Sequence, residues 1–347
     1  MRAAVVRRTG GPEALVLETL PDPAPRAGEV IVAVAHCGVC FHDVVTRNGT
    51  LKAGVEAPFI PGHEIAGTIA ALGRDVRGFA VGDRVAATQR SHVCGHCRYC
   101  RSAREPLCAE AVFTGDRGLN GGYADFVALE AESLVRVPDG LGLDAASIAA
   151  CAIGTAYHAV VAVGRVQAAE TVLVTGAGGG VGIHAVQVAR AAGATVLAET
   201  GSPAKVAALR EAGAHHVILH ARGEDFSAAV RDATEGEGVE VVVDTVGTPV
   251  FAPTRRSLAR GGRWVMVGQL TGGFVPFNPA QLFLKGISLL SSTSVTREEL
   301  RRCLALLANG TLRAVLGEAL PLSAAAEAHR RLEAGAALGR MTLVPGG

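Results

Sequence analysis

Short apolar stretches separated by polar turns fill the first part of the chain. Val, Ile, Ala and Leu gather over residues 30–35, 65–72 and 83–87, and Pro, Gly and Asp bound these runs. Apolar or β-branched runs between turn formers are typical of strands. Two more such runs, at 123–129 and 134–137, follow a cysteine-dense segment. We therefore predict that this part of the chain is rich in β-structure.

The pattern changes near residue 143. Residues 143–163 are rich in Ala, which predicts a helix with Asp144 as its N-cap. From residue 171, short apolar runs alternate with helical segments, and such alternation predicts βαβ units and a parallel sheet. The expected strands cover 172–175, 195–198, 217–219, 239–243, 263–267 and 287–292, and the expected helices cover 181–191, 203–211, 226–234 and 253–259.

The last part of the chain returns to mixed structure. Helices are expected at 297–308 and 324–333, and strands at 315–320 and 340–344. This segment is too short to build a core of its own, so we expect it to pack back on the β-rich region. A chain of 347 residues therefore predicts two domains, the first of them interrupted in sequence by the second.

Charge and composition exclude several classes of partner. The chain carries 33 Lys and Arg against 32 Asp and Glu, so it offers no general attraction for nucleic acid or an anionic membrane. It has no long apolar run free of charges and glycine turns, and no secretory signal follows Met1, so we expect no membrane span and a cytoplasmic protein. In a reducing compartment the eight cysteines are poor candidates for disulfides.

A glycine-rich loop follows the strand predicted at 172–175. The sequence VLVTGAGGGVG places Ala177, Gly179 and Gly182 at the spaced positions of a G-x-G-x-x-G motif, with alanine at the first. The backbone of such a loop turns tightly and approaches a pyrophosphate at the N-terminus of the next helix. We predict a nicotinamide dinucleotide here, and a plain flexible turn is the alternative. The expected contacts are Gly176, Ala177, Gly179, Gly180, Val181 and Gly182.

The end of the second strand of this domain bears on the choice between NAD and NADP. An acidic residue at the ribose-facing position would bind the 2′-hydroxyl of NAD. Glu199 is close, but if the strand ends one residue later, Thr200 holds that position, because neighbouring strand residues face opposite ways. Gly201 and Ser202 continue the turn without repelling a 2′-phosphate, so we predict NADP rather than NAD. Lys205 either reaches the ribose or phosphate or is an exposed helix lysine.

Four cysteines lie in one short segment, residues 94–108, which we name the cysteine lobe. Two, two and seven residues separate Cys94, Cys97, Cys100 and Cys108. Four thiolates in one loop can enclose a tetrahedral zinc without leaving an open position, which is the pattern of a structural site. An iron–sulfur cluster uses related spacings, and disulfides are the third possibility. We predict a structural zinc.

Three further residues, Cys40, His63 and Cys151, are dispersed and form no local motif. Each alone is well explained as an ordinary buried side chain. In chain order, however, the GHE sequence at 62–64, the cysteine lobe and the glycine loop resemble the zinc-containing medium-chain alcohol dehydrogenases over essentially the whole chain. The resemblance implies that Cys40, His63 and Cys151 bind a catalytic zinc with water or substrate in its fourth position, making two zinc ions per chain.

The resemblance also assigns two carboxylates near these residues. Asp43 matches the family's carboxylate that orients the zinc-bound histidine, which fixes the histidine tautomer. Glu64 matches the glutamate beside the zinc that can assist ligand exchange. Cys37 aligns with no ligand, and we interpret Cys37 and Cys303 as ordinary core thiols.

One position departs from the family pattern. The residue two after the first cysteine ligand is usually Ser or Thr, whose hydroxyl starts a proton relay, but here it is His42. We predict that His42 passes the proton between substrate and solvent, because imidazole takes both protonation states near neutrality. A merely structural imidazole is the alternative. The stretches VTGAGGGVGIHAVQVA and DTVGTP also resemble branches related to acryloyl-CoA reductase and quinone oxidoreductase, which reduce an activated C=C bond.

The resemblance implies an α/β protein of two domains. Residues 1–151 and 294–347 would form a GroES-like β-rich catalytic domain, and residues 152–293 a Rossmann doubly wound parallel sheet, with the active site in the cleft between them. Gly247 and Gly268 follow two predicted strands and would flank the nicotinamide, although strand-end glycines also serve plain turns.

The expected function is a zinc-dependent oxidoreductase that moves a hydride between NAD(P)(H) and a small-molecule alcohol or carbonyl compound. Reduction of an activated C=C bond in an enoyl thioester or a quinone is the first alternative. A zinc-bearing binding protein without catalytic activity is the second. By analogy with the family, we expect a homodimer or homotetramer.

Overall fold

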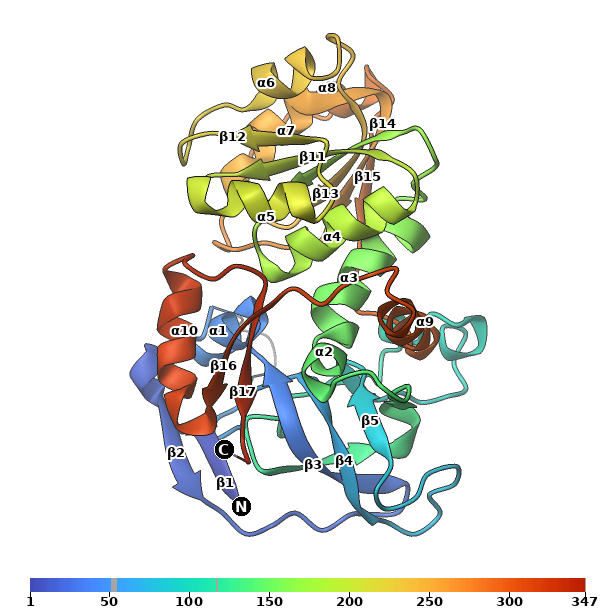
Figure 1. Cartoon of the computed structure of the whole chain (residues 1–347), viewed down its shortest axis with the longest axis vertical. Coiled ribbons are helices and arrows are strands. Elements are labelled where there is room, and N and C mark those ends of the chain that lie inside the picture. Colours follow the sequence, from blue (N-terminus) through green and yellow to red (C-terminus); the bar gives the residue numbers. More distant parts are fainter. Residues whose placement is uncertain (51–54, 117, 347) are drawn as a thin grey trace. The chain divides into compact units, whose positions relative to one another are not determined.

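The computed structural model describes residues 1–50, 55–116 and 118–346. The chain divides into two compact units, Met1–Gly154 together with Ser294–Gly347, and Thr155–Thr293. The second unit therefore interrupts the first in sequence, and Figure 1 shows the C-terminal segment lying beside the N-terminal strands of the first unit. No helix in the described part of the chain has the length and apolar character needed to cross a membrane.

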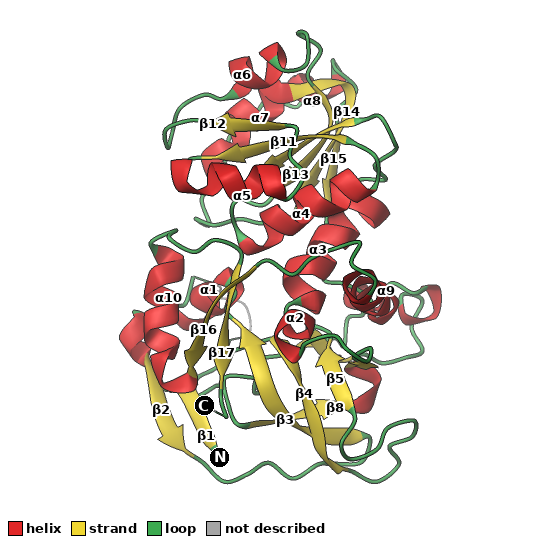
Figure 2. Cartoon of the chain, viewed as in Figure 1, coloured by secondary structure: helices red, strands yellow, loops and turns green. Residues whose placement is uncertain are grey.

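The first unit is built around a seven-stranded sheet that combines strands from both of its segments (Figure 2). Its order is β16-β17-β3-β4-β5-β9, and β8 pairs with β3 beside this path. β1 pairs with β2, and β6 pairs with β7, as separate antiparallel ribbons. The strands are β1 Arg2–Val6, β2 Leu15–Thr19, β3 Glu29–Gly38, β4 Glu64–Leu72, β5 Arg84–Ala87, β6 Arg90–His92, β7 Val112–Phe113, β8 Phe126–Glu130, β9 Leu134–Arg136, β16 Leu316–Pro321 and β17 Arg340–Val344.

The helices of the first unit are α1 Phe41–Arg47, α2 Leu143–Ser147, α9 Arg297–Ala308 and α10 Ala325–Glu333. The expectation for 297–308 agrees with α9, which begins at a capping box formed by Thr296 and Glu299. The sequence pattern did not reveal α1. It spans only seven residues, and the interlocking bonds of Cys40 and Asp43 at its N-terminus define it more clearly than any apolar period.

The stretch expected as one helix over 143–163 is helical but not uniform. α2 is followed by π-helical turns at Ala149–Ile153 and His158–Val163, which flank the short α3 Gly154–Tyr157. The predicted cap was wrong: Gly142 is the N-cap, and the Asp144 carboxylate accepts a hydrogen bond from Ala145 N inside the first turn. Wide π-turns often occur at functional sites.

The second unit contains one parallel sheet of six strands in the order β12-β11-β10-β13-β14-β15. This is the 3-2-1-4-5-6 order of a Rossmann fold, with its switch point between β10 and β13. Figure 2 shows α4 and α5 in front of this sheet, and α6 and α7 behind it. The elements are β10 Thr171–Thr175, α4 Gly180–Ala191, β11 Thr195–Thr200, α5 Val206–Glu211, β12 His216–Leu219, α6 Ser227–Asp232, β13 Val239–Asp244, α7 Phe251–Ser257, β14 Leu258–Met266, α8 Ala280–Phe283 and β15 Ser288–Ser291.

The sheet core of the second unit carries one buried polar junction. Trp264 is fully buried among apolar side chains, its ring packs against Phe251, and its Nε1 donates to Asp244 Oδ2. Asp244 Oδ1 also accepts a hydrogen bond from Thr175 Oγ1. Asp244 therefore ties the ends of the neighbouring strands β10 and β13 together and also holds the indole of Trp264 in β14.

Candidate functional site

The three dispersed residues Cys40, His63 and Cys151 meet in the first unit. Strands β3 and β4 pair antiparallel with Gly38 opposite Glu64, so Cys40, just after β3, lies beside His63, just before β4. Cys151 joins them from the π-helical turn at Ala149–Ile153. The ligand atoms of these three residues and of Glu64 lie within 4.8 Å of one another, and all four side chains are buried.

The donor set and its spacing fit zinc. Two thiols, one imidazole and one carboxylate are the donors that zinc prefers. Zinc–sulfur bonds of about 2.3 Å at a tetrahedral angle place two sulfurs about 3.8 Å apart. Cys40 Sγ and Cys151 Sγ lie 3.8 Å apart. Hydrogen bonding from Cys151 lowers the pKa of Cys40, which favours the thiolate that a metal binds.

Asp43 fixes the orientation of the imidazole. Its Oδ1 lies 3.2 Å from His63 Nδ1 and accepts a hydrogen bond from Gly62 N, while its Oδ2 accepts one from Cys40 N. Burial acts to raise the pKa of Asp43, but the attraction of His63 outweighs it and the pKa is lowered. A carboxylate on Nδ1 leaves Nε2 available as the metal ligand.

Glu64 is the fourth member of this buried group. Its Oε1 lies 3.1 Å from the Arg340 guanidinium, which comes from the C-terminal strand β17. Burial raises the pKa of Glu64 to about 7, against the opposing effect of Arg340. The carboxylate lies so close to Gly38 that a Cβ there would be 2.1 Å from Glu64 Oε2. Gly38 is therefore required to leave space for Glu64.

His42 lies beside the group in α1 and remains partly exposed. Its ring centroid is 5.3 Å from that of His63 and 4.4 Å from that of Phe113. Its Nε2 lies 3.3 Å from Asp116 Oδ2, and the side chain of Asp116 is buried. Sequence reasoning did not find Asp116, because 74 residues separate it from His42 and no motif links them.

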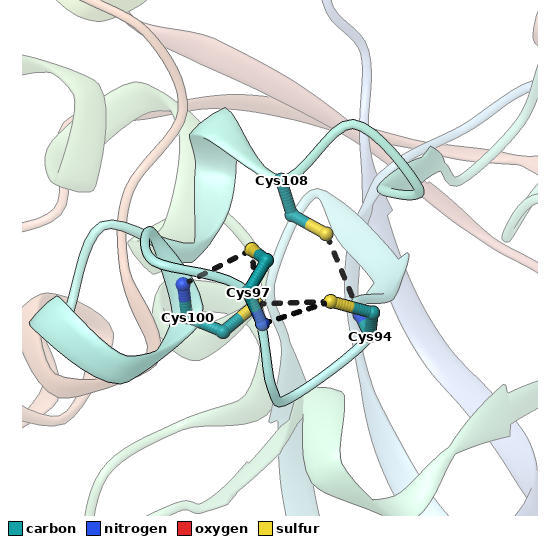
Figure 3. A group of neighbouring side chains, drawn as sticks. All are labelled: Cys94, Cys97, Cys100 and Cys108. Carbon is teal, nitrogen blue, oxygen red and sulfur yellow. Dashed lines mark hydrogen bonds between the residues drawn. The ribbon is translucent and has the colours of Figure 1, made fainter.

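The cysteine lobe also brings its four thiols together (Figure 3). The sulfur of Cys100 is 3.9 Å from that of Cys94 and 3.6 Å from that of Cys97, close to the separation expected around one tetrahedral zinc. Backbone N–H groups of Cys94, Cys97 and Cys100 point at neighbouring sulfurs. The N–H of Cys100 is the main cause that lowers the pKa of Cys97 to about 7. All eight cysteines are free thiols, so disulfides do not occupy this loop.

The glycine loop of the second unit joins β10 to α4. Gly176 has φ +60°, and Gly179 is the N-cap of α4 without a side-chain cap, so its helix N-terminus is free to bind an anion. A Cβ at Gly182 would lie 2.4 Å from the Gly176 carbonyl oxygen. The stem of Lys205 lies over the loop, since a Cβ at Gly178 would be 2.4 Å from Lys205 Cδ. Gly180, Val181 and Gly182 form the first turn of the helix.

The end of β11 gives Glu199 a definite role. Its Oε2 accepts a hydrogen bond from Gly176 N at 2.7 Å, and its Oε1 lies 2.5 Å from His220 Nε2. The strand continues to Thr200, whose Oγ1 accepts a hydrogen bond from Ser202 N. Glu199 therefore holds the glycine loop, while the following turn through Gly201 carries no acidic side chain.

Gly247 and Gly268 lie at the carboxyl edge of the same sheet. Gly247 has φ +82°, and its N–H donates to Asp244 Oδ1. A Cβ at Gly268 would be 2.4 Å from the carbonyl oxygen of Thr245. Both glycines are thus required by the close approach of the loops that follow β13 and β14, and the loop after β13 borders the switch point, where ligands bind in such sheets.

Comparison with known proteins agrees with this arrangement. The family model for the alcohol dehydrogenase GroES-like domain matches residues 26–139, and the model for the zinc-binding dehydrogenases matches residues 180–309. The chain belongs to the medium-chain dehydrogenase/reductase superfamily. The predicted fold class, a GroES-like domain with a Rossmann domain, is confirmed.

Relatives of this dehydrogenase/reductase span its full length. Acryloyl-coenzyme A reductases from Sulfurisphaera tokodaii and Metallosphaera sedula are 31% and 33% identical, covering 99% of this chain and 100% and 99% of theirs. An alcohol dehydrogenase from Geobacillus stearothermophilus is 32% identical over 99% of both chains. The crystal structure of AibC shares 46% identity at a TM-score of 0.91, over 99% of this chain and 95% of that one.

A solved NAD-dependent alcohol dehydrogenase shares 33% identity at a TM-score of 0.92, over 99% of each chain. Together these findings make the protein an NAD(P)-dependent oxidoreductase of the alcohol dehydrogenase and reductase family.

Proposed function

We propose that this enzyme is zinc-dependent and transfers a hydride between NADP(H) and an alcohol or carbonyl substrate. The observation that carries the proposal is the buried group of Cys40, His63 and Cys151, whose sulfur separation suits a tetrahedral zinc. When bound there, zinc supplies a Lewis acid for the substrate oxygen, and the nicotinamide supplies or accepts the hydride. The cysteine lobe would hold a second, structural zinc.

The residues around this group have distinct tasks in the proposal. Asp43 holds His63 in one tautomer through its contact with Nδ1. Glu64 is an alternative carboxylate ligand that assists exchange of water and substrate. His42 passes a proton between substrate and solvent, and Asp116 holds the imidazole by its contact with Nε2.

Replacement of His42 tests its part in the reaction. We expect His42→Ala to lower kcat on the order of a hundredfold, which is typical for loss of a positioned proton-transfer group. His216→Ala, which removes an exposed histidine of β12, is the control and should keep the wild-type kcat. An unchanged kcat in His42→Ala would leave His42 with a structural role only.

The preference for NADP rests on the turn after β11. Because Glu199 is engaged by the glycine loop, only Thr200, Gly201 and Ser202 are offered near the expected ribose position, and none of them repels a 2′-phosphate. Lys205, which overlies the loop, supplies a positive charge for that phosphate. Titration with NADPH and NADH, followed by nicotinamide fluorescence, tests the preference, and tighter binding of NADH would reverse it.

Reduction of an activated C=C bond is the second candidate function. Relatives at 31% and 33% identity are acryloyl-coenzyme A reductases, and His42 replaces the hydroxyl residue expected in an alcohol dehydrogenase. Polarising the carbonyl of an unsaturated thioester would direct hydride to its β-carbon instead of to a carbonyl carbon.

One screen separates the two candidates. The enzyme is assayed with both reduced coenzymes against aldehydes, ketones, quinones and enoyl thioesters, and zinc per chain is measured on the same sample. Carbonyl reduction with two zinc ions supports the proposal, and a preference for enoyl thioesters supports the second candidate. A single zinc per chain would contradict the proposed catalytic zinc.

We also propose that the enzyme is a homodimer or a homotetramer. Light scattering during size-exclusion chromatography tests this proposal.

A further inference from the structure

A buried tyrosine and a buried histidine extend the hydrogen-bonded group behind His63. Tyr123 Oη lies 3.4 Å from Asp43 Oδ2 and 3.1 Å from His329 Nε2. Both rings are fully buried and meet edge to face, with their centroids 5.8 Å apart. The contacts therefore connect His63, Asp43, Tyr123 and His329 in one line, although these residues come from four separate segments of the first unit.

The chemistry of these groups determines which of them donates and which accepts each hydrogen bond. An ionised carboxylate only accepts hydrogen bonds, so Asp43 requires Tyr123 to donate its single proton. The tyrosine oxygen can then accept from His329, which places the imidazole proton on Nε2. His329 Nδ1 has no hydrogen-bond partner among the described residues, as expected for the bare nitrogen of that tautomer. Burial lowers the pKa of His329 to about 4, so the neutral form is the stable one.

The backbone around Tyr123 holds its ring against the segment before His63. Tyr123 N donates to the carbonyl oxygen of Pro61, and a Cβ at Gly62 would lie 2.5 Å from Tyr123 Cδ1. Gly62 itself has φ +102° and donates its N–H to Asp43 Oδ1. Tyr123 thus contacts both the carboxylate and the turn that presents His63.

The helix α10 that carries His329 is anchored beside α1. Arg47 is fully buried at the end of α1, and its Nη2 lies 2.6 Å from Glu333 Oε1 at the end of α10. Asp43 and Arg47 are four residues apart, so they lie on the same face of α1. One short helix therefore receives two contacts that lead to the C-terminal segment, one through Tyr123 and one direct.

We propose that Tyr123 and His329 are positioning residues that hold Asp43, and through it His63, so that the C-terminal helix α10 sets how tightly the first unit retains the metal at Cys40, His63 and Cys151. The inference rests on the proposed zinc of that site. Groups that support a ligating histidine from behind alter metal affinity by about 10- to 100-fold. Because Tyr123 and His329 act one step further out than Asp43, we expect the lower end of this range.

Metal release tests the inference, with the cysteine lobe as an internal reference. Tyr123→Phe removes the hydroxyl and keeps the ring, and Tyr157→Phe, on a half-buried tyrosine outside the group, is the matched control. Enzyme holding two zinc ions is mixed with a chromogenic chelator. In Tyr123→Phe we expect one zinc to leave about tenfold faster than in the wild type, while release of the second zinc and the helix content stay unchanged.

Substitutions at His329 separate positioning from packing. His329→Leu should release the same zinc faster, and His329→Gln, which can place a donor near the former Nε2, should restore slow release. Cobalt substitution gives a second readout, since the visible absorption of cobalt at the Cys40 site should change in Tyr123→Phe and not in Tyr157→Phe. Wild-type release and an unchanged spectrum in Tyr123→Phe, or equal loss from both sites, would overturn the inference.

Failure of the proposed function is distinguishable from failure of this inference. A wild-type enzyme that holds zinc only in the cysteine lobe would overturn both. A wild-type enzyme with two zinc ions, together with a Tyr123→Phe variant that releases them at the wild-type rate, would overturn the positioning role alone.

Discussion

The carboxylate of Glu199 should control how well the glycine loop binds the coenzyme. It accepts a hydrogen bond from Gly176 N at 2.7 Å and contacts His220 Nε2 at 2.5 Å, and only 4% of the residue is exposed. In Glu199→Gln, the amide oxygen can still face Gly176 and the amide nitrogen can face His220. Shape is preserved while the negative charge is removed.

The expected effect follows from these two contacts. A hydrogen bond to a charged group contributes about 1.5–3 kcal/mol, and one between neutral groups about 1 kcal/mol. Removing the charge from both contacts therefore costs about 2 kcal/mol. If the loop must hold this conformation to bind the pyrophosphate, the whole loss falls on binding, and the Kd for NADPH rises about 30-fold. The Kd for NADH should rise by the same factor, because both coenzymes share the pyrophosphate.

Fluorescence titration of the reduced coenzymes measures the change. Glu240→Gln is the matched control, because Glu240 also accepts a backbone hydrogen bond in this sheet, from Thr171 N at the opposite end of β10. It should bind both coenzymes as the wild type does. A Glu199→Gln enzyme with wild-type affinity would refute the reasoning. So would an NADH affinity that falls while NADPH binding is kept, since Glu199 would then act on the ribose.

Three further predictions follow from the same geometry. Gly182→Ala should lower the thermal midpoint, because its Cβ would lie 2.4 Å from the Gly176 carbonyl oxygen. Gly179→Ala, whose Cβ would have its nearest atom at 3.4 Å, should keep the midpoint and weaken coenzyme binding. Calorimetry and titration measure the two effects, and equal midpoints for the two variants would contradict the first. Cys97→Ser should remove one zinc per chain by elemental analysis and lower the thermal midpoint, and retention of two zinc ions would count against a metal in the lobe. His329 has its pKa lowered to about 4, so between pH 6.5 and 4 the unfolded chain binds a proton that the folded chain excludes. Its contribution to the unfolding free energy should fall by about 3 kcal/mol as the pH drops through this window, urea titrations of His329→Gln should show a smaller drop, and parallel pH profiles would exclude the effect.

Local patterns in the sequence were sufficient for the two short motifs. The four cysteines of the cysteine lobe lie within fifteen residues, so loop closure alone brings their sulfurs near one another. The glycine loop needs only a preceding strand and a following helix, both visible in the apolar pattern. The alternation after residue 171 likewise determined the parallel sheet, because the chirality of βαβ units restricts their arrangement.

The dispersed group required more than local pattern. Cys40, His63 and Cys151 were assigned through resemblance to a family, since nothing in their spacing links them. In the structure, the register of β3 against β4 places Cys40 beside His63, and a one-residue shift would turn the side chains to opposite faces. Register depends on the packing of a whole sheet, which a stretch of sequence does not contain.

The sequence pattern by itself determined a β-rich region, a domain with a parallel sheet, a glycine loop and a cysteine lobe, and the family resemblance implied the GroES-like and Rossmann folds. The tertiary structure alone decided which polar side chains surround Cys40, His63, Glu64 and Cys151. Asp116 contacts His42, and Arg340 contacts Glu64. Tyr123 contacts both Asp43 and His329. It also showed that Glu199 holds the glycine loop. Two of these contacts join residues more than 200 positions apart in the chain, and no local propensity encodes them. They exist because burial leaves each polar group only the partners that packing brings within reach.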